Sequence, residues 1–182
     1  MAKIAIMMAD GCEEIEALTV VDLLRRAGLT IDMLAIEQQP MITGSHGIVI
    51  GVDAYLGDVN LESYDGIVLP GGMPGTTHLK ESAAVCDAVK AFFAAGKLVA
   101  AICAAPTVLG FCGILEGKHA TCYPGCEDDL TGALLSEDTV VCDGNIITSR
   151  GMGTAIPFGL ELISYLLNAD VADQLSRGIV FK

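Results

Sequence analysis

One of the seven cysteines stands where a nucleophile could be presented for reaction. Cys103 directly follows the apolar run 98–102, and two alanines separate it from Pro106. The run predicts a strand, and a proline without an N–H suits the first turn of a helix. Strand, sharp turn and helix together form a nucleophile elbow, with the reactive atom facing backbone N–H groups. We expect the helix N-terminus to lower the pKa of the thiol and favour the reactive thiolate.

The alternative is that Cys103 is an ordinary core residue, because free cysteine is among the most buried residue types. Two further segments favour chemistry. The acidic segment 13–16 and the glycine pair Gly71-Gly72 each follow a predicted strand, and glycines let backbone N–H groups approach a ligand closely. Ligands of open α/β sheets bind at the carboxyl ends of the strands. We therefore expect these two loops and the elbow to converge on one site.

Strands and helices alternate along the chain. A β-α-β unit is predicted over residues 3–36, with Ile15, Leu18, Leu23 and Leu24 near one apolar face of its helix. Ser82 is a candidate helix cap, and the predicted hairpins are 41–52 and 140–149. The remaining predicted elements are the strands 65–69 and 120–122 and the helices 82–95, after Pro106, and from about 154 to 167. This pattern predicts one α/β domain over residues 1–182, a doubly wound sandwich around a mostly parallel sheet.

The composition excludes several classes of partner. The formal net charge is −13, from 10 basic and 23 acidic residues, which argues against binding to nucleic acid or to an anionic membrane. The first residues contain an apolar run that is too short for a signal peptide and is followed at once by acidic residues. Seven unevenly spaced cysteines then suggest reduced thiols, and we expect a cytoplasmic protein.

Four motifs in order carry a resemblance to a known family. They are Asp-Gly-Cys-Glu-Glu-Ile-Glu-Ala at 10–17, Leu-Pro-Gly-Gly at 69–72, Ala-Ala-Ile-Cys-Ala-Ala-Pro-Thr at 100–107 and Thr-Ser-Arg-Gly-Met-Gly-Thr-Ala at 148–155. Together they span nearly the whole chain. The sequence resembles the ThiJ/PfpI superfamily, in the branch of the Parkinson-disease-associated protein deglycase and its bacterial relatives. The resemblance implies a flavodoxin-like three-layer fold and a homodimer with its site near the interface.

The resemblance also implies roles for particular residues. Cys103 matches the reactive, easily oxidised cysteine and Glu16 the glutamate that meets it. Gly72 and Ala104 would offer backbone N–H groups as an oxyanion hole, and Gly71 and Tyr123 would line the pocket. Tyr123 stands where some relatives have a histidine beside the cysteine, and Ala104 where the peptidase-like branch has one, so no protease is predicted. His46 occupies a position where close relatives carry an arginine near the interface.

Cys103 and Glu16 would repel each other if both were ionised, so one of the two groups must hold a proton. Our hypothesis places the proton on Glu16 and leaves Cys103 as a thiolate, which supplies a nucleophile beside a general acid/base. The implied substrates are methylglyoxal-type carbonyls or glycated side chains, processed without a cofactor. The alternative is a redox sensor or stress chaperone in which Cys103 is oxidised, with Cys12 as a conceivable disulfide partner.

A metal site is the remaining alternative. Cys112, His119, Cys122 and Cys126 include thiolate and imidazole ligands that suit zinc. Their spacing matches no compact zinc-finger pattern, so we expect no metal. Glu13 and Glu14 are interpreted as helix-start acids that complement the helix dipole.

Overall fold

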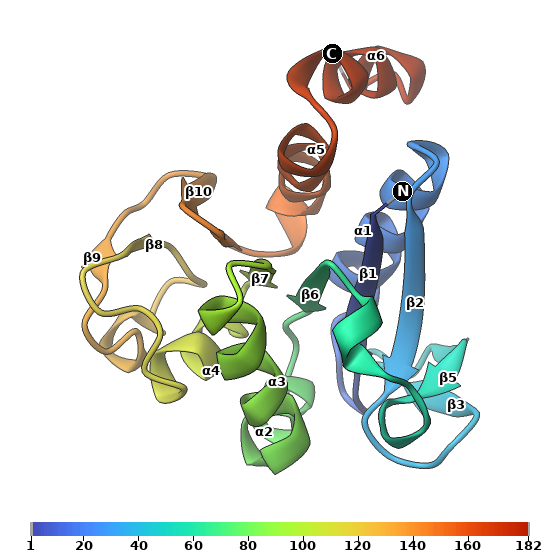
Figure 1. Ribbon diagram of the computed structural model, residues 1–182, viewed down its shortest axis with the longest axis vertical. Helices are drawn as coiled ribbons and strands as arrows, with labels where there is room; N and C mark the ends of the chain where they lie inside the picture. The colour runs from blue at the N-terminus through green and yellow to red at the C-terminus, as the bar shows by residue number, and fades with distance from the viewer. Residues whose placement is uncertain (1, 182) are drawn as a thin grey trace.

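The computed structural model describes residues 2–181, which form three layers around a seven-stranded sheet (Figure 1). Every neighbouring pair of strands in the sheet is parallel except the hairpin at one edge, which is antiparallel. In spatial order the strands are β10 (Val140–Asp143), β11 (Ile146–Ser149), β7 (Leu98–Ile102), β6 (Gly66–Leu69), β1 (Lys3–Met8), β2 (Thr30–Ala35) and β5 (Ala54–Tyr55). The predicted α/β sandwich with a mostly parallel sheet is confirmed.

Helices cover both faces of this sheet. One face packs against α1 (Glu14–Arg26), α5 (Ala155–Leu166) and α6 (Ala169–Gly178), and the other against α2 (Gly75–Glu81), α3 (Ala83–Ala94) and α4 (Pro106–Phe111). Side chains of a strand alternate between the faces, so in β1 Ile4 and Ile6 join one buried cluster while Ala5 and Met7 join the other. Both faces of the central strands are therefore buried, which explains their continuous apolar runs.

Smaller elements lie outside the central sheet. The predicted hairpin at 41–52 is confirmed as β3 (Met41–Thr43) and β4 (Val49–Gly51), and β8 (His119–Ala120) pairs with β9 (Leu134–Leu135). Four single turns of 3-10 helix are η1 (Leu56–Asp58), η2 (Leu61–Ser63), η3 (Glu127–Asp129) and η4 (Met152–Thr154).

The apolar face of α1 differs from the prediction. Ile15 and Leu18 are 47% and 36% exposed, so they do not belong to the core with Leu23 and Leu24. The buried face is built mainly from small and branched side chains, namely Ala17, Val20, Val21, Leu23 and Leu24. Ile15 and Leu18 therefore lie outside the face of α1 that packs against α5 and the sheet.

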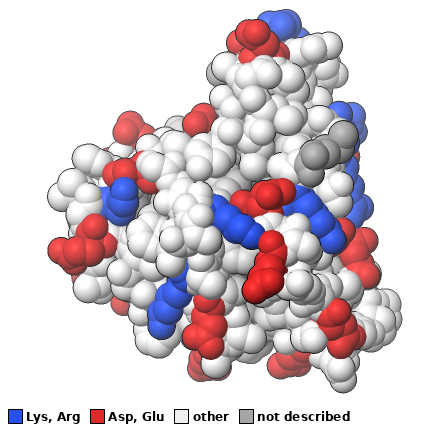
Figure 2. All heavy atoms as spheres, viewed as in Figure 1, with Lys and Arg blue, Asp and Glu red and all other residues white. Residues whose placement is uncertain are grey.

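The surface carries its charges in a mixed pattern. On the face shown in Figure 2, Lys and Arg side chains are scattered among acidic ones rather than gathered into a continuous basic stripe. No helix within residues 2–181 is both long enough and apolar enough to cross a membrane.

Candidate active site

Four loops meet at the carboxyl edge of the sheet, each directly after a parallel strand. They follow β1, β6, β7 and β11, which lie beside one another in the order β11, β7, β6, β1. Backbone hydrogen bonds join the loops: Glu13 N–H donates to Gly71 O (2.8 Å), and Cys103 N–H donates to Ser149 O (3.0 Å). The convergence that the sequence predicts for the first three loops is present, and the loop after β11 completes it.

Cys103 occupies a sharp corner between β7 and α4. Its φ of 65° lies in the left-handed region, which is costly for a residue with a side chain and persists only where surrounding contacts impose it. Its N–H bond to Ser149 is one such contact, and the Tyr123 N–H, which donates to Cys103 O (2.8 Å), is another. The corner holds the partly exposed thiol at the edge of the sheet, as a nucleophile elbow requires.

Glu16 approaches the thiol from the first turn of α1. The residue is 1% exposed, and its Oε2 accepts a hydrogen bond from Gly71 N–H (2.9 Å). Its own N–H donates to the side chain of Glu13, the N-cap residue of the helix (2.7 Å). Oε1 makes no ordinary hydrogen bond with any described residue, and the remaining interaction of the carboxyl is with the Cys103 thiol. Glu16 thus presents to the sulfur a carboxyl that has no other side-chain partner among the described residues.

The glycine pair leaves room for this contact. A Cβ on Gly71 would lie 2.6 Å from both Cys103 Cβ and Glu16 Oε2, far inside van der Waals contact. A Cβ on Gly72 would collide with the backbone N of Glu13, and its φ of 89° suits only glycine. No other residue type fits between the cysteine and the glutamate.

Two backbone N–H groups point at the sulfur. Those of Ala104 and Gly72 both hydrogen bond to Cys103 and lower the pKa of its thiol. They come from different loops, and neither belongs to α4, which begins at Pro106. The structure therefore brings together Cys103, Glu16, Gly72 and Ala104, the four residues that the sequence singles out for chemistry.

Both groups of the pair have raised pKa values. Burial raises the pKa of Glu16 to about 7. Burial and the neighbouring Glu16 carboxylate raise the pKa of Cys103 to about 12, outweighing the two N–H groups. At neutral pH the pair therefore holds one negative charge at most. The placement of the remaining proton on Glu16, with Cys103 as the thiolate, stays a prediction.

Tyr123 and Gly151 border the sulfur on its outer side. Tyr123 is 52% exposed, and a Cβ on Gly151 would lie 3.3 Å from the tyrosine ring and 3.9 Å from Cys103 Sγ. The Tyr123 ring and Cys103 Sγ therefore both lie near Gly151, and a role for Tyr123 in the pocket stays a prediction. Gly151 was missed as a residue near the sulfur, although it lies within the 148–155 motif.

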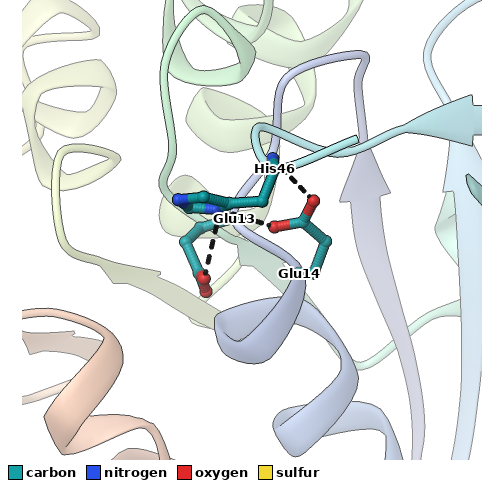
Figure 3. Close-up of side chains that lie close together, drawn as sticks. All are labelled: Glu13, Glu14 and His46. Carbon is teal, nitrogen blue, oxygen red and sulfur yellow. Dashed lines mark hydrogen bonds and ion pairs between the residues drawn. The ribbon is translucent and has the colours of Figure 1, made fainter. Parts of the chain in front are cut away.

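A second cluster of titratable side chains joins the start of α1 to the loop of the β3–β4 hairpin (Figure 3). Potential ligand atoms of Glu13, Glu14 and His46 all lie within 4.8 Å of one another, close enough to surround a metal ion. Both oxygens of Glu14 already accept hydrogen bonds from the loop of the β3–β4 hairpin, at 2.8 Å from His46 N–H and 3.0 Å from His46 Nδ1. The cluster is explained as a carboxylate that anchors this loop, so Glu14 is more than the helix-start acid that the sequence suggests.

The remaining cysteines do not join the site. Cys12 is fully buried, and its burial and the nearby acidic groups raise its pKa to about 12. Among the described residues, Cys112, His119, Cys122 and Cys126 do not form a group able to hold a metal. Cys112 lies instead beside Cys86, on the opposite face of the sheet from α1.

An α/β sandwich with a cysteine on an elbow and a buried glutamate against it defines a recognisable class of protein. A family model described as the DJ-1/PfpI family matches residues 2–165, and this chain belongs to that family. The resemblance inferred from the four motifs is therefore confirmed.

Individual relatives agree with this assignment. Protein DJ-1 homolog B of Arabidopsis thaliana is 39% identical over 99% of this chain, which spans 42% of that longer protein. A deglycase of Pyrococcus abyssi is 34% identical over 90% of this chain and 99% of its own. The solved structure of oxidized DJ-1 from Toxoplasma gondii is 36% identical and superimposes with a TM-score of 0.95, covering 99% of this chain and 98% of that one. The flavodoxin-like fold is confirmed by this likeness.

Proposed function

We propose that this chain is a cysteine-dependent stress-response enzyme that acts on methylglyoxal-type carbonyls or on their adducts with protein side chains. The observation that carries the proposal is the buried carboxyl of Glu16 against the thiol of Cys103, beneath two converging N–H groups. A deglycase among the relatives supports the same substrate class.

Glu16 acts as the general base for Cys103 in this proposal. The singly charged pair shares one proton, and Glu16 is the group placed to hold that proton while the sulfur attacks. A carboxyl with a pKa of about 7 is well suited to both accept and return a proton near neutral pH.

The reaction balances with water as the only co-reactant. A bond forms between Cys103 Sγ and the aldehyde carbon, the thiol proton passes to Glu16, and Glu16 returns it to the aldehyde oxygen to give a hemithioacetal. Glu16 then moves the proton of that carbon to the neighbouring carbonyl carbon, with a compensating proton shift between the oxygens, and a thioester results. Water cleaves the thioester, which releases a 2-hydroxy acid and restores the thiol.

The two N–H groups have a distinct part in this sequence. Negative charge develops on the aldehyde oxygen when the carbon–sulfur bond forms, and the N–H groups of Gly72 and Ala104 converge beside the sulfur where that oxygen would lie. Fixed donors of this kind typically contribute about 3 kcal/mol to such a step.

The decisive experiment is methylglyoxal consumption and lactate formation by the purified, chelator-treated protein. Cys103→Ser should abolish turnover. Cys142→Ser is the matched control, because Cys142 is exposed on β10 at the edge of the sheet, and it should retain wild-type turnover. Equal lactate formation by the Cys103→Ser variant and the wild type would refute the proposal.

A second candidate function is oxidation sensing by Cys103. The same N–H groups, together with a protonated Glu16, would hydrogen bond to the oxygens of a sulfinic acid. The DJ-1 relative from Toxoplasma gondii was solved in its oxidized form. Absence of turnover combined with addition of two oxygens at Cys103 alone by peroxide, measured by mass spectrometry, would establish the sensor in place of the enzyme.

We also propose a homodimer in the cytoplasm, where Cys103 would remain reduced. Apolar side chains are exposed around the start of α1 and the neighbouring hairpin, namely Ile15, Leu18, Ile48 and Val49. Burying them against a second copy would remove apolar surface from water beside the active site. Light scattering of the purified protein should give twice the mass of the chain, and Ile48→Glu should give the single mass.

A further inference from the structure

Two cysteines that the proposed reaction does not use lie in contact on the face of the sheet opposite α1. Cys86 belongs to the start of α3, and Cys112 is the C-cap residue of α4. Cys112 Sγ lies 3.8 Å from the carbonyl oxygen of Cys86, and the two thiols hydrogen bond to each other. This contact joins residues that are 26 positions apart in the chain. The fold therefore holds two reduced sulfurs within reach of each other.

The pair is shielded from solvent without being fully enclosed. Cys86 and Cys112 are 6% and 8% exposed, whereas the apolar cluster that contains them includes fully buried side chains such as Val85 and Leu109. Such partial exposure admits an oxidant of the size of hydrogen peroxide. It leaves no room for a bulky thiol such as glutathione to bond to either sulfur. The sulfurs therefore have each other as their available partners.

We propose that Cys86 and Cys112 form a second redox site, a dithiol that a small hydroperoxide converts into an intramolecular disulfide. A sulfenic acid that forms beside a second thiol condenses with it to a disulfide, whereas an isolated one can be oxidised further. The site lies at the far end of α4 from Cys103 and does not depend on the proposed turnover of carbonyls.

The oxidation is balanced with the hydroperoxide as the only co-reactant. The first sulfur attacks one peroxide oxygen, the oxygen–oxygen bond breaks, and the thiol proton leaves with the departing oxygen as water or an alcohol. This step gives a sulfenic acid. The second sulfur then attacks the sulfenic sulfur, the sulfur–oxygen bond breaks, and the hydroxyl group leaves with the second thiol proton as water. The two sulfurs together lose two electrons, which the peroxide gains.

The surroundings of the two sulfurs distinguish their parts. Burial and the neighbouring Cys86 thiol raise the pKa of Cys112 to about 12, and the ammonium group of Lys90 opposes this shift only in part. A thiol that keeps its proton suits the second step, because that proton must leave with the hydroxyl group. Cys86 is therefore the sulfur that is oxidised first, and Cys112 is the one that closes the disulfide.

The disulfide would tie together two helices on one face of the sheet. Helix α4 begins at Pro106, soon after the corner at Cys103, and ends beside α3 at Cys112 (Figure 1). A covalent bond between the two helices restricts the unfolded chain more than the folded one. The oxidised protein should therefore unfold at a higher urea concentration than the reduced protein, and dithiothreitol should reverse the shift.

Hydrogen peroxide is the probe for this site, applied to the full chain and to its Cys103→Ser variant. After the remaining thiols are blocked in denaturant, digestion without a reductant should give a peptide that joins Cys86 to Cys112 with the loss of two hydrogen atoms. Dithiothreitol should separate this peptide into its two parts. Both proteins should form it equally, because the two sites are separate. Cys112→Ser should form no such peptide and should accumulate a sulfenic acid at Cys86 that dimedone traps.

Cys122→Ser is the matched control, because Cys122 is 3% exposed in the same apolar cluster, and it should form the joined peptide as the wild type does. Three results would overturn the proposal: unmodified Cys86 and Cys112 where peroxide has fully oxidised Cys103, oxygen added to either sulfur without a joined peptide, or joined peptides only between two chains. The wild-type result needs no variant, so misfolding of Cys112→Ser cannot obscure it. Methylglyoxal turnover is measured separately, so failure of either proposal is seen independently.

Discussion

Two glutamates on the first turn of α1 are both shielded from solvent but have opposite acidities. Glu14 and Glu16 are each 1% exposed and stand two residues apart. The pKa of Glu14 is lowered to about 2, whereas that of Glu16 is raised to about 7. Both feel the same helix N-terminus, so the helix dipole cannot account for the difference.

The depth of each carboxylate and its hydrogen-bond partners together explain the contrast. Burial alone would raise the pKa of Glu14, but hydrogen bonds from its own N–H, from the ring and N–H of His46 and from the N–H of Ile48 reverse that effect. Glu16 receives one backbone hydrogen bond, from Gly71, and otherwise faces a thiol. A buried carboxylate that is fully hydrogen bonded stays charged and fixes a loop, whereas one with a free oxygen beside a nucleophile can exchange a proton.

The largest expected effect concerns turnover. Glu16→Gln should lower kcat/KM for methylglyoxal by roughly a thousandfold, within the usual range for loss of a general base. Glu14→Gln should lower it by less than about tenfold, because Glu14 touches the hairpin rather than the sulfur. The two variants are compared by lactate formation at pH 7.5 under identical substrate concentrations. Equal losses in both variants would mean that Glu16, like Glu14, acts only through the fold.

Glu16→Gln and Glu14→Gln should change the free energy of unfolding in opposite directions. The folded protein holds the Glu16 proton more tightly than the unfolded chain, so this contribution is present below about pH 4.3 and is lost as pH rises through about 7. Glu16→Gln should therefore be more stable than wild type at about pH 8.5, by up to roughly 3 kcal/mol, and gain nothing at about pH 4.

Glu14→Gln should show the opposite trend. Because the pKa of Glu14 is lowered in the folded protein, its charged form stabilises the fold, fully so above about pH 4.3 and decreasingly as pH falls toward about 2. Glu14→Gln should be less stable than wild type by roughly 3 kcal/mol at neutral pH, and the gap should narrow in acid. Urea unfolding at several pH values measures both variants, and a shift of the same sign would contradict the assigned acidities.

The sequence predicts the fold and the convergence of the site loops, but not the contrast between the two glutamates. The alternating apolar runs and the glycine positions predict the sheet, both hairpins and the convergence of Glu16, Gly71 and Cys103, because strand order in a parallel sheet brings those loops together. The elbow at Cys103 was predicted from its neighbours, the apolar strand and Pro106. These features depend on local pattern, which the chain displays directly.

What could not be predicted depends on distant partners. Nothing near Glu14 in the sequence shows that residues 45–48 will donate to it, and nothing near Cys103 shows that burial outweighs the two N–H groups. The short helices α2 and α6 were missed, since α2 has only seven residues and α6 is a polar, amphipathic segment at the end of the chain. Long-range hydrogen bonds and burial set these acidities, and neither has a local signature.

The pH profile sharpens the comparison further. Turnover requires the singly charged pair, whichever group carries the remaining proton, so kcat/KM should rise about tenfold per pH unit below about pH 7 and level off above it. Glu14 is already ionised throughout that range, so Glu14→Gln should keep the same profile. Alkylation of Cys103 by neutral iodoacetamide provides an independent measure. A flat profile between pH 5 and 8 would show that Glu16 does not titrate there.

The smallest expected effect concerns His46, the exposed member of the cluster with Glu13 and Glu14. His46→Ala removes one of the donors to Glu14, but the imidazole is 72% exposed and the N–H groups of residues 46 and 48 remain. The free energy of unfolding should fall by less than about 1 kcal/mol, as is usual for an exposed ion pair. His119→Ala, which removes a similarly exposed imidazole paired with Asp143, is the matched control. If His46→Ala lowered the free energy of unfolding as much as Glu14→Gln does, the hydrogen bond from the histidine ring, rather than those from the hairpin backbone, would hold Glu14 in place.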